Sequence, residues 1–197
     1  MGNLTARRAI IIVLVAVCCL LVVPGIAGAS VKAKYRAEYK ARVNALKSEF
    51  TVWARAYDSA RDQSIQTADA ISSAADHDLQ LLYEQQARQE YVDNLGLPED
   101  WNITYAKTVN AFKAKATRYF ASAAQQKHFK TACDQLKAGA RKLILLANTH
   151  VYDSFQELST DPPDYVTQQA MLDFGDKDAA AGHEGFDKQV AALKALL

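Results

Sequence analysis

The stretch that decides the fold is residues 39–60, YKARVNALKSEFTVWARAYDSA. Its apolar residues recur at alternating intervals of four and three: Tyr39, Val43, Leu46, Phe50, Trp53, Tyr57 and Ala60. That spacing puts them on one face of an α-helix and is typical of a coiled-coil seam, the stripe along which one helix packs on another. We therefore expect a long helix whose buried face is rich in aromatic rings.

This helix is predicted to extend well beyond the quoted stretch. Neither Pro nor Gly, the two strongest helix breakers, occurs between Ser30 and Leu95. After Ser64 the apolar pattern slips by one residue and then continues through Leu82. We expect the first helix to persist to about Val92.

A turn is predicted in residues 93–100, DNLGLPED. Gly96 suits the end of a helix, and Pro98 follows shortly after it, which is the order in which helices usually stop. A second apolar pattern in steps of four and three then runs from Trp101 to Leu158, where a Pro pair follows. The sequence thus predicts two helical stretches of similar length around one short turn.

The fold class that follows is all-α: an N-terminal hydrophobic helix, then a long antiparallel helical hairpin or coiled-coil-like helical bundle. Small residues cluster in residues 68–75 and 121–124, at comparable distances before and after Gly96. Small side chains let two helices approach closely, so we interpret these clusters as the waist of a hairpin. The alternative is that the helices break at the pattern slips near Ser64 and Gln126 and fold into a compact four-helix bundle.

The C-terminal part, residues 161–197, is predicted to hold short helices and a linker. Residues 165–174 suit a short helix, residues 175–185 are polar and contain Gly, and residues 186–197 carry their apolar side chains on one face. A short amphipathic helix is not stable alone. The last segment must therefore dock on the bundle, on a partner or on a membrane surface.

Residues 1–29 are predicted to be a signal-anchor or a signal peptide. The 21 residues from Ala9 to Ala29 carry no charge, and about 20 apolar residues are needed to cross a bilayer core. The same segment has the parts of a secretory signal, with Arg7 and Arg8 before the apolar run and small residues at its end. Cleavage would fall between Ala29 and Ser30.

The charges that follow this segment argue against export. Five basic residues lie directly after it, offset by Glu38 alone: Lys32, Lys34, Arg36, Lys40 and Arg42. Such a flank tends to stay in the cytoplasm. Because leader, apolar run and small-residue site agree with one another, we expect the helical domain on the exported side, held by a single-pass helix or secreted if cleaved after Ala29.

The expected domains are residues 1–29, the helical hairpin or bundle of residues 30–160, and residues 161–197. Without residues 1–29, the chain has 21 Lys and Arg against 22 Asp and Glu, a net charge of −1. A near-neutral, mixed surface offers no field that would attract a nucleic acid. We therefore predict no nucleic-acid partner.

The sequence contains no motif that would carry chemistry. Metal sites in helical bundles use Glu-x-x-His or His-Glu-x-x-His on one helix face, and neither occurs. The four histidines, His77, His128, His150 and His183, are far apart and are interpreted as surface or seam residues. We predict no catalytic residue, no metal site and no cofactor, and therefore no enzymatic activity.

Two residue groups have alternative interpretations. Cys133 is the one cysteine beyond the apolar segment, so it has no partner for an intramolecular disulfide and is expected to be a small buried residue. The seam aromatics are expected to pack as a core, or alternatively to line a cavity for an apolar ligand. They are Tyr39, Phe50, Trp53, Tyr57, Trp101, Tyr105, Phe112 and Tyr119.

The expected function is that of a membrane-anchored helical structural or interaction protein, acting in membrane or envelope assembly or in partner recognition. Its partners would be the lipid bilayer and a second protein or another copy of the chain, bound through the helical seams. The alternative is a secreted helical-bundle module, released after Ala29, that binds a small apolar ligand or a protein.

Overall fold

The computed structural model describes residues 30–197, which fold almost entirely into helix and form no strand. The prediction of an all-α domain is confirmed for this part of the chain. The elements are the short η1 (Ala33–Tyr35), α2 (Arg36–Ser72), α3 (His77–Asn94), α4 (Leu97–Lys113), the short α5 (Ala116–Tyr119), α6 (Ala123–Arg141), the π-helix η2 (Lys142–Ala147), α7 (Asn148–Leu158) and α8 (Tyr165–Lys194).

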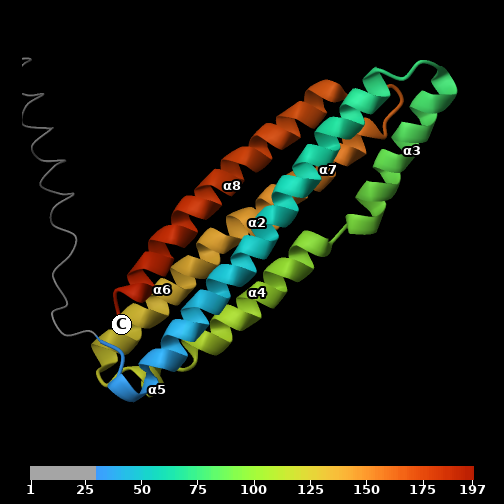
Figure 1. Cartoon of the computed structure of the whole chain (residues 1–197). Helices are drawn as coiled ribbons and strands as arrows, with labels where there is room; N and C mark the ends of the chain where they lie inside the picture. The colour runs from blue at the N-terminus through green and yellow to red at the C-terminus, as the bar shows by residue number, and fades with distance from the viewer. Residues whose placement is uncertain (1–29) are drawn as a thin grey trace, which may run out of the picture. The chain divides into compact units, whose positions relative to one another are not determined.

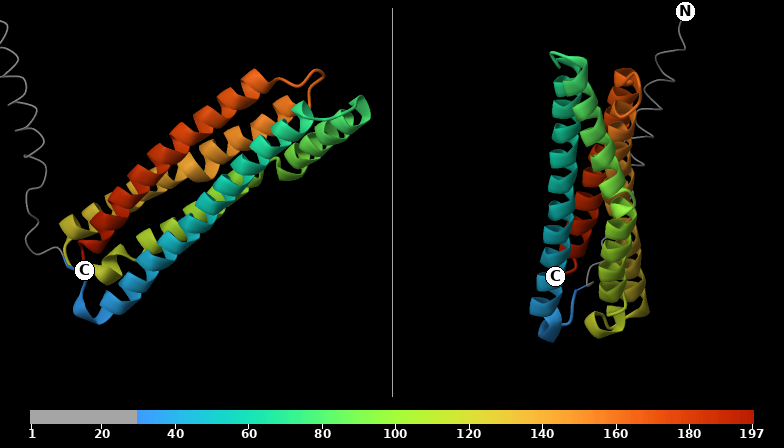
Figure 2. Two further views of the ribbon diagram at one scale, coloured as in Figure 1. Left: turned by 45° about the horizontal axis from the view of Figure 1, so that its top comes forward. Right: turned by 90° about the vertical axis from the view of Figure 1, so that its right-hand side faces the viewer.

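These elements form a four-helix bundle in which the chain runs up, down, up and down (Figure 1). Helix α2 is the first arm, α3 and α4 together form the second, and α8 is the fourth. The third arm is continuous, since α6, η2 and α7 follow one another without a break. The views in Figure 2 show the four arms side by side. Residues 31–197 form one compact unit.

The bundle corrects the prediction of a long two-helix hairpin. The first helix ends at Ser72 rather than near Val92, and the chain reverses there; it reverses again between α4 and α6. Small polar side chains cause these breaks, because they satisfy the backbone groups that helix ends leave unpaired. Asp76 accepts a hydrogen bond from the Leu79 N–H at the start of α3, and Ser122 caps α6 in the same way. The four-helix alternative is confirmed as a bundle, but its breaks were misplaced, because α2 runs on through Ser64 and Gln126 lies within α6.

The turn predicted at residues 93–100 is not a reversal. Two residues separate the end of α3 from the beginning of α4, which runs on in the same direction (Figure 1). Gly96 has a φ of 87°, which a residue with a side chain rarely adopts, and Pro98 lies in the first turn of α4. The glycine signal therefore marked a helix end correctly, but it carried no information about the direction of the next helix.

The linker predicted at residues 175–185 is also wrong, because α8 runs unbroken from Tyr165 to Lys194. Its glycines face the core and let helices approach closely. A Cβ added at Gly182 in α8 would lie 2.9 Å from the backbone nitrogen of Leu143 in η2. Conversely, a Cβ added at Gly139 in α6 would lie 2.9 Å from the backbone nitrogen of Phe186 in α8. Residues 165–194 are thus one arm of the bundle and not a separate C-terminal region.

Aromatic rings fill the core at the end of the bundle where the described chain begins. Five rings pack against one another there, with centroids 4.9 to 6.5 Å apart, and each is at most 1% exposed: Tyr39, Phe112, Tyr119, Phe120 and Phe129. Backbone hydrogen bonds close this end, from the N–H of Val31 to the carbonyl of Leu196 and from that of Lys32 to Tyr119. The first and last residues of the domain are therefore joined.

Candidate interaction surfaces

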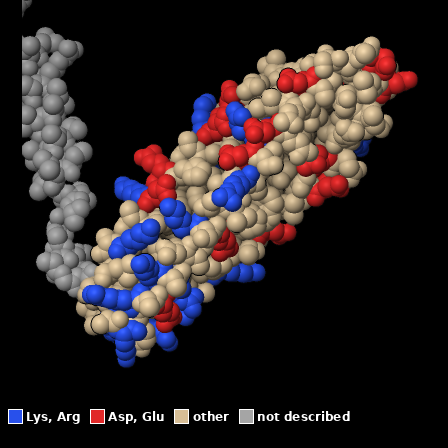
Figure 3. Space-filling model, in the orientation of Figure 1, with Lys and Arg blue, Asp and Glu red and all other residues tan. Residues whose placement is uncertain are grey.

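Charge is divided unevenly along the bundle. Trp53 and Trp101, stacked with centroids 4.9 Å apart, lie between two halves of opposite sign. Residues 30–53, 103–141 and 180–197, the half where the described chain begins, contain 16 Lys and Arg against five Asp and Glu, a net charge of +11. The other described residues contain five Lys and Arg against 17 Asp and Glu, a net charge of −12. Figure 3 shows this separation on one face.

We call the tip of the positive half the basic end, and define it by its exposed Lys and Arg side chains. They come from the beginning of α2, from α5, from the beginning of α6 and from the end of α8: Lys34, Arg36, Lys40, Arg118, Lys127, Lys130 and Lys194. The chain enters the bundle at this end, because Val31 is buried beside Leu196. Whatever precedes Ser30 is thus attached at the basic end.

One carboxylate organises part of this surface. Glu38 accepts hydrogen bonds from Lys115 at 3.1 Å, from Arg118 at 2.9 Å and from the Tyr119 hydroxyl at 3.0 Å. These bonds lower the pKa of Glu38 from 4.5 to about 2, and the bond from Lys115 has the largest effect. The cluster ties the beginning of α2 to the α5 corner, so it supports the shape of the basic end.

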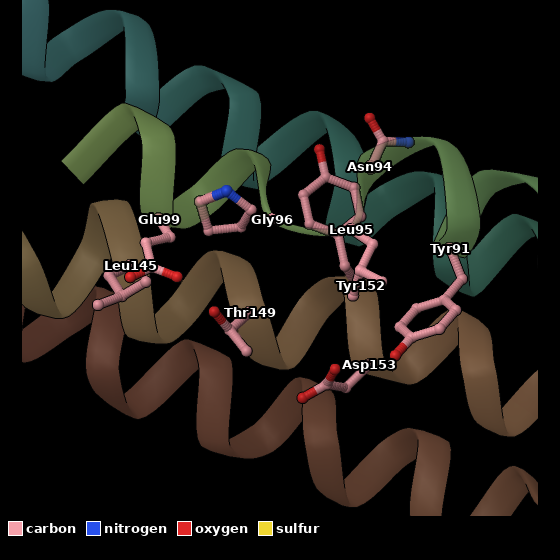
Figure 4. Close-up of a pocket in the computed structure, with 10 residues that line it drawn as sticks. Tyr91, Asn94, Leu95, Gly96, Glu99, Leu145, Thr149, Tyr152 and Asp153 are labelled. Carbon is pink, nitrogen blue, oxygen red and sulfur yellow. The ribbon is translucent and has the colours of Figure 1, made fainter. Parts of the chain in front are cut away.

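The second candidate surface is a groove of about 230 Å³ where α3 and α4 meet above η2 and α7 (Figure 4). We call it the joint groove. It is lined by Tyr91, Asn94, Leu95, Gly96, Pro98, Glu99, Leu145, Thr149, Tyr152 and Asp153. Leu95 is 66% exposed, whereas Pro98 and Tyr152 are buried. The groove is therefore mainly apolar, with two carboxylic acids among its lining side chains.

Two local departures from α-helix shape this groove. On one side, Leu95 and Gly96 interrupt the second arm; on the other, η2 is a π-helix, which holds more residues per turn than an α-helix. The buried Asn148 follows η2, and its side-chain N–H donates to the Leu143 carbonyl at 2.9 Å. This bond satisfies a carbonyl in the irregular segment.

The acids of the joint groove have no basic partner. Among residues 30–197, the salt bridges involve neither Glu99 nor Asp153. Burial raises the pKa of Asp153, and the nearby His150 only partly opposes this. His150 is itself oriented toward Asp178, with 3.6 Å between Nε2 and Oδ2. Asp153 is thus a partly desolvated carboxyl group without a cation.

The residues singled out in the sequence lie in the core or apart from one another. Six of the eight seam aromatics are buried in the core, as in the parallel stack of Phe50 on Phe186 at 3.8 Å, so the core interpretation is confirmed for them; Trp53 and Trp101 are only partly buried. Cys133 is fully buried, as expected, and burial raises the pKa of its thiol to about 12. The four histidines do not meet; in the described part of the chain, no cluster of three or more His, Cys, Asp or Glu could hold a metal ion.

Neither candidate surface was found from the sequence. The joint groove combines residues 91–99 with residues 145–153, and although both stretches have helical spacing, neither indicates that the other packs against it. The charge division did leave a signal, because residues 107–142 hold nine Lys and Arg with one Asp, and a mostly acidic stretch follows. A charge pattern along the chain does not show which charges lie together on the surface until the arrangement of the helices is known.

Comparisons of the chain with protein-family models, with curated proteins and with solved structures found no match. Among the helices of residues 30–197, none has the length and apolar character required to cross a bilayer. The expected transmembrane or signal helix falls in residues 1–29, outside the described residues.

Proposed function

We propose that this protein is a non-enzymatic, membrane-anchored helical bundle that acts in membrane or envelope assembly or in partner recognition, with its basic end against anionic lipid headgroups. One observation carries the proposal: the apolar segment of residues 9–29 is joined to the bundle at its basic end. An anchor in a bilayer would therefore hold this positive surface, and not the acidic half, near the headgroups.

The electrostatics favour this arrangement. Each Lys or Arg near an anionic leaflet contributes about 1 kcal/mol of attraction, which falls off within a Debye length. The basic end offers seven such side chains, while the half with a net charge of −12 is repelled by the same surface. The bundle would thus project from the bilayer by roughly the length of α2, whose 37 residues span about 55 Å.

Mass spectrometry of the mature N-terminus distinguishes the anchored protein from the secreted alternative. We expect a chain that still contains residues 1–29 in the membrane fraction. A chain that begins at Ser30 in the soluble exported fraction would overturn the anchor. Protease protection on intact cells then tests the proposed exported location, since export exposes the acidic half to added protease.

The lipid contact is testable with the full chain in nanodiscs that carry a gadolinium-chelating lipid, which broadens NMR signals of nearby amides. With anionic nanodiscs we expect broadening at Lys127 and Lys130 and none near Asp161. The double variant Lys127→Glu/Lys130→Glu should weaken this broadening, while Lys177→Glu in the acidic half is the matched control. Equal broadening in zwitterionic and anionic nanodiscs would show a tether without a headgroup contact.

A protein partner is favoured over a small apolar ligand as the second binding role. The aromatic side chains that would have lined a ligand cavity pack against one another instead, as in the five-ring cluster around Tyr39. The joint groove, in contrast, is open at the surface. The same role would suit a secreted form of the bundle.

A further inference from the structure

We propose that the joint groove binds a basic, partly apolar segment of a partner protein, with a Lys or Arg side chain placed between Tyr91 and Tyr152 and beside Asp153. This inference names the partner chemistry for the recognition role proposed above and rests on that role. It depends on the acidic half of the bundle and not on the basic end.

The groove has the chemistry that recognises an organic cation. Figure 4 shows the ring of Tyr91 extending from α3 toward Asp153 on α7, with Tyr152 beside Leu95 and Glu99 farther along the groove. Aromatic faces attract ammonium and guanidinium groups, and carboxylates pair with them. The aliphatic stem of a Lys or Arg also suits an apolar lining, because these side chains bury their stems while the charge stays near polar groups.

The raised pKa of Asp153 supports a cation as the partner of this groove. Burial disfavours its carboxylate, and no Lys or Arg of the described chain compensates for this. A cation entering the groove would restore the balance by pairing with the charged form. Ionisation of Asp153 is thus less favourable in the free bundle than in the complex.

The surroundings favour a protein segment over a lipid or a nucleic acid. Both of those carry phosphate, which the half with a net charge of −12 repels. A segment that alternates basic and apolar residues would instead meet complementary charge along this half. Leu95 in the groove lining is 66% exposed, and Val92, which follows the lining residue Tyr91 in the chain, is 55% exposed; both offer contacts for the apolar residues of the segment.

The test uses the full chain in zwitterionic nanodiscs and the fluorescence anisotropy of a short labelled peptide of alternating Lys and Leu, with empty nanodiscs as the blank. We expect saturable binding of this peptide and none of a matched Glu and Leu peptide. Asp153→Asn should weaken binding about tenfold, equivalent to about 1.4 kcal/mol. Thr149→Arg, which puts a positive charge into the groove, should abolish it.

Asp58→Asn is the matched control, since it removes the same charge from an exposed position of α2 outside the groove. It should change the affinity less than twofold. If Asp58→Asn weakens binding as much as Asp153→Asn, the peptide follows the general field and the groove proposal is wrong. Absence of saturable binding by the natural sequence also overturns it.

Two further measurements separate the possible failures. Thermal unfolding by circular dichroism shows whether Thr149→Arg still folds; if it does not, Glu99→Gln, on the exposed rim, replaces it with an expected loss of about threefold. The variant Lys127→Glu/Lys130→Glu should keep peptide binding while it loses the headgroup contact. In the natural sequence, peptide binding without a headgroup contact would contradict the proposed function alone, and a headgroup contact without peptide binding would contradict this inference alone.

Discussion

Gly139 shows how closely two arms of the bundle approach. An added Cβ would meet backbone atoms of α8 at 2.9 and 3.0 Å, and a backbone cannot move aside as a flexible side chain can. Overpacking of this kind costs about 1–3 kcal/mol, against a gain of up to about 1 kcal/mol for Ala over Gly in a helix. We expect Gly139→Ala to lower the free energy of unfolding by about 1–2 kcal/mol, measured by urea denaturation.

Gly185→Ala is the matched control for this prediction. Gly185 faces Gly139 from α8, but the nearest atom to its added Cβ is 3.4 Å away, an ordinary contact. The substitution should be neutral or stabilise the protein by up to about 1 kcal/mol through helix propensity. If both variants behave alike, close backbone packing is not what selects Gly at position 139.

Glu38 gives a pH dependence with a defined sign. Its pKa in the folded protein, about 2, lies below the ordinary value of 4.5, so its contribution to stability is present above pH 4.5 and is lost as the pH falls through 2. Glu38→Gln should therefore lower the melting temperature at pH 7, and the difference from the natural sequence should shrink between pH 4.5 and pH 2. Melting curves by circular dichroism at several pH values measure this.

A difference that stays constant over that range would mean that Glu38 acts through uncharged hydrogen bonds. Asp134→Asn is a useful comparison, since Asp134 pairs with Lys113 at 2.6 Å but lies outside the Glu38 cluster. Its effect on melting should be smaller, because the exposed ion pairs of Asp134 with Lys113 and Lys137 contribute little.

At the scale of elements, the interruption between α3 and α4 depends on one backbone conformation. Gly96 has a φ of 87°, and no atom lies within 4 Å of an added Cβ, so a substitution there is strained by the backbone alone. We expect Gly96→Ala to cost about 1–2 kcal/mol in urea denaturation and Gly96→Asn to cost less, because Asn visits this conformation more readily. Equal costs would point to a cause other than backbone conformation.

The elements also show what could be predicted from the sequence. The apolar spacing from Tyr39 onward predicted α2 and its aromatic face, since periodicity follows directly from burial on one side of a helix. The break after Ser72 was missed because small residues suit both close helix packing and helix ends. The continuity of α8 through Gly175 and Gly182 was missed because Gly marks a linker when the chain is exposed and close packing when it is buried, and burial is a tertiary property.

The joint groove was beyond sequence reasoning for a related reason. Tyr91, Glu99 and Asp153 lie on three different elements, and nothing in the residues around Asp153 distinguishes it from an acid on a solvated helix face. The pKa of its carboxyl group is raised by burial in the folded bundle. Features of single helices were therefore predictable, whereas features created where helices meet were not.

At the scale of the whole molecule, the division of charge predicts a strong dependence on salt. The Debye length falls from about 10 Å at 0.1 M to about 3 Å at 1 M salt, so screening should remove the attraction between the basic end and anionic lipid. In the nanodisc experiment, the broadening at Lys127 should therefore decrease strongly between these concentrations while the protein stays attached. Broadening that is unchanged at 1 M salt would indicate an apolar contact instead.

The backbone bond between Val31 and Leu196 has a practical consequence for anyone who labels this protein. Since the two ends of the domain meet, a fluorescent protein or affinity tag fused after Leu197 would crowd the surface proposed to contact lipid. The loops at residues 73–76 and 159–164 lie at the opposite end of the bundle (Figure 1) and join helices that are complete on either side. A reporter inserted in one of them would leave the basic end free.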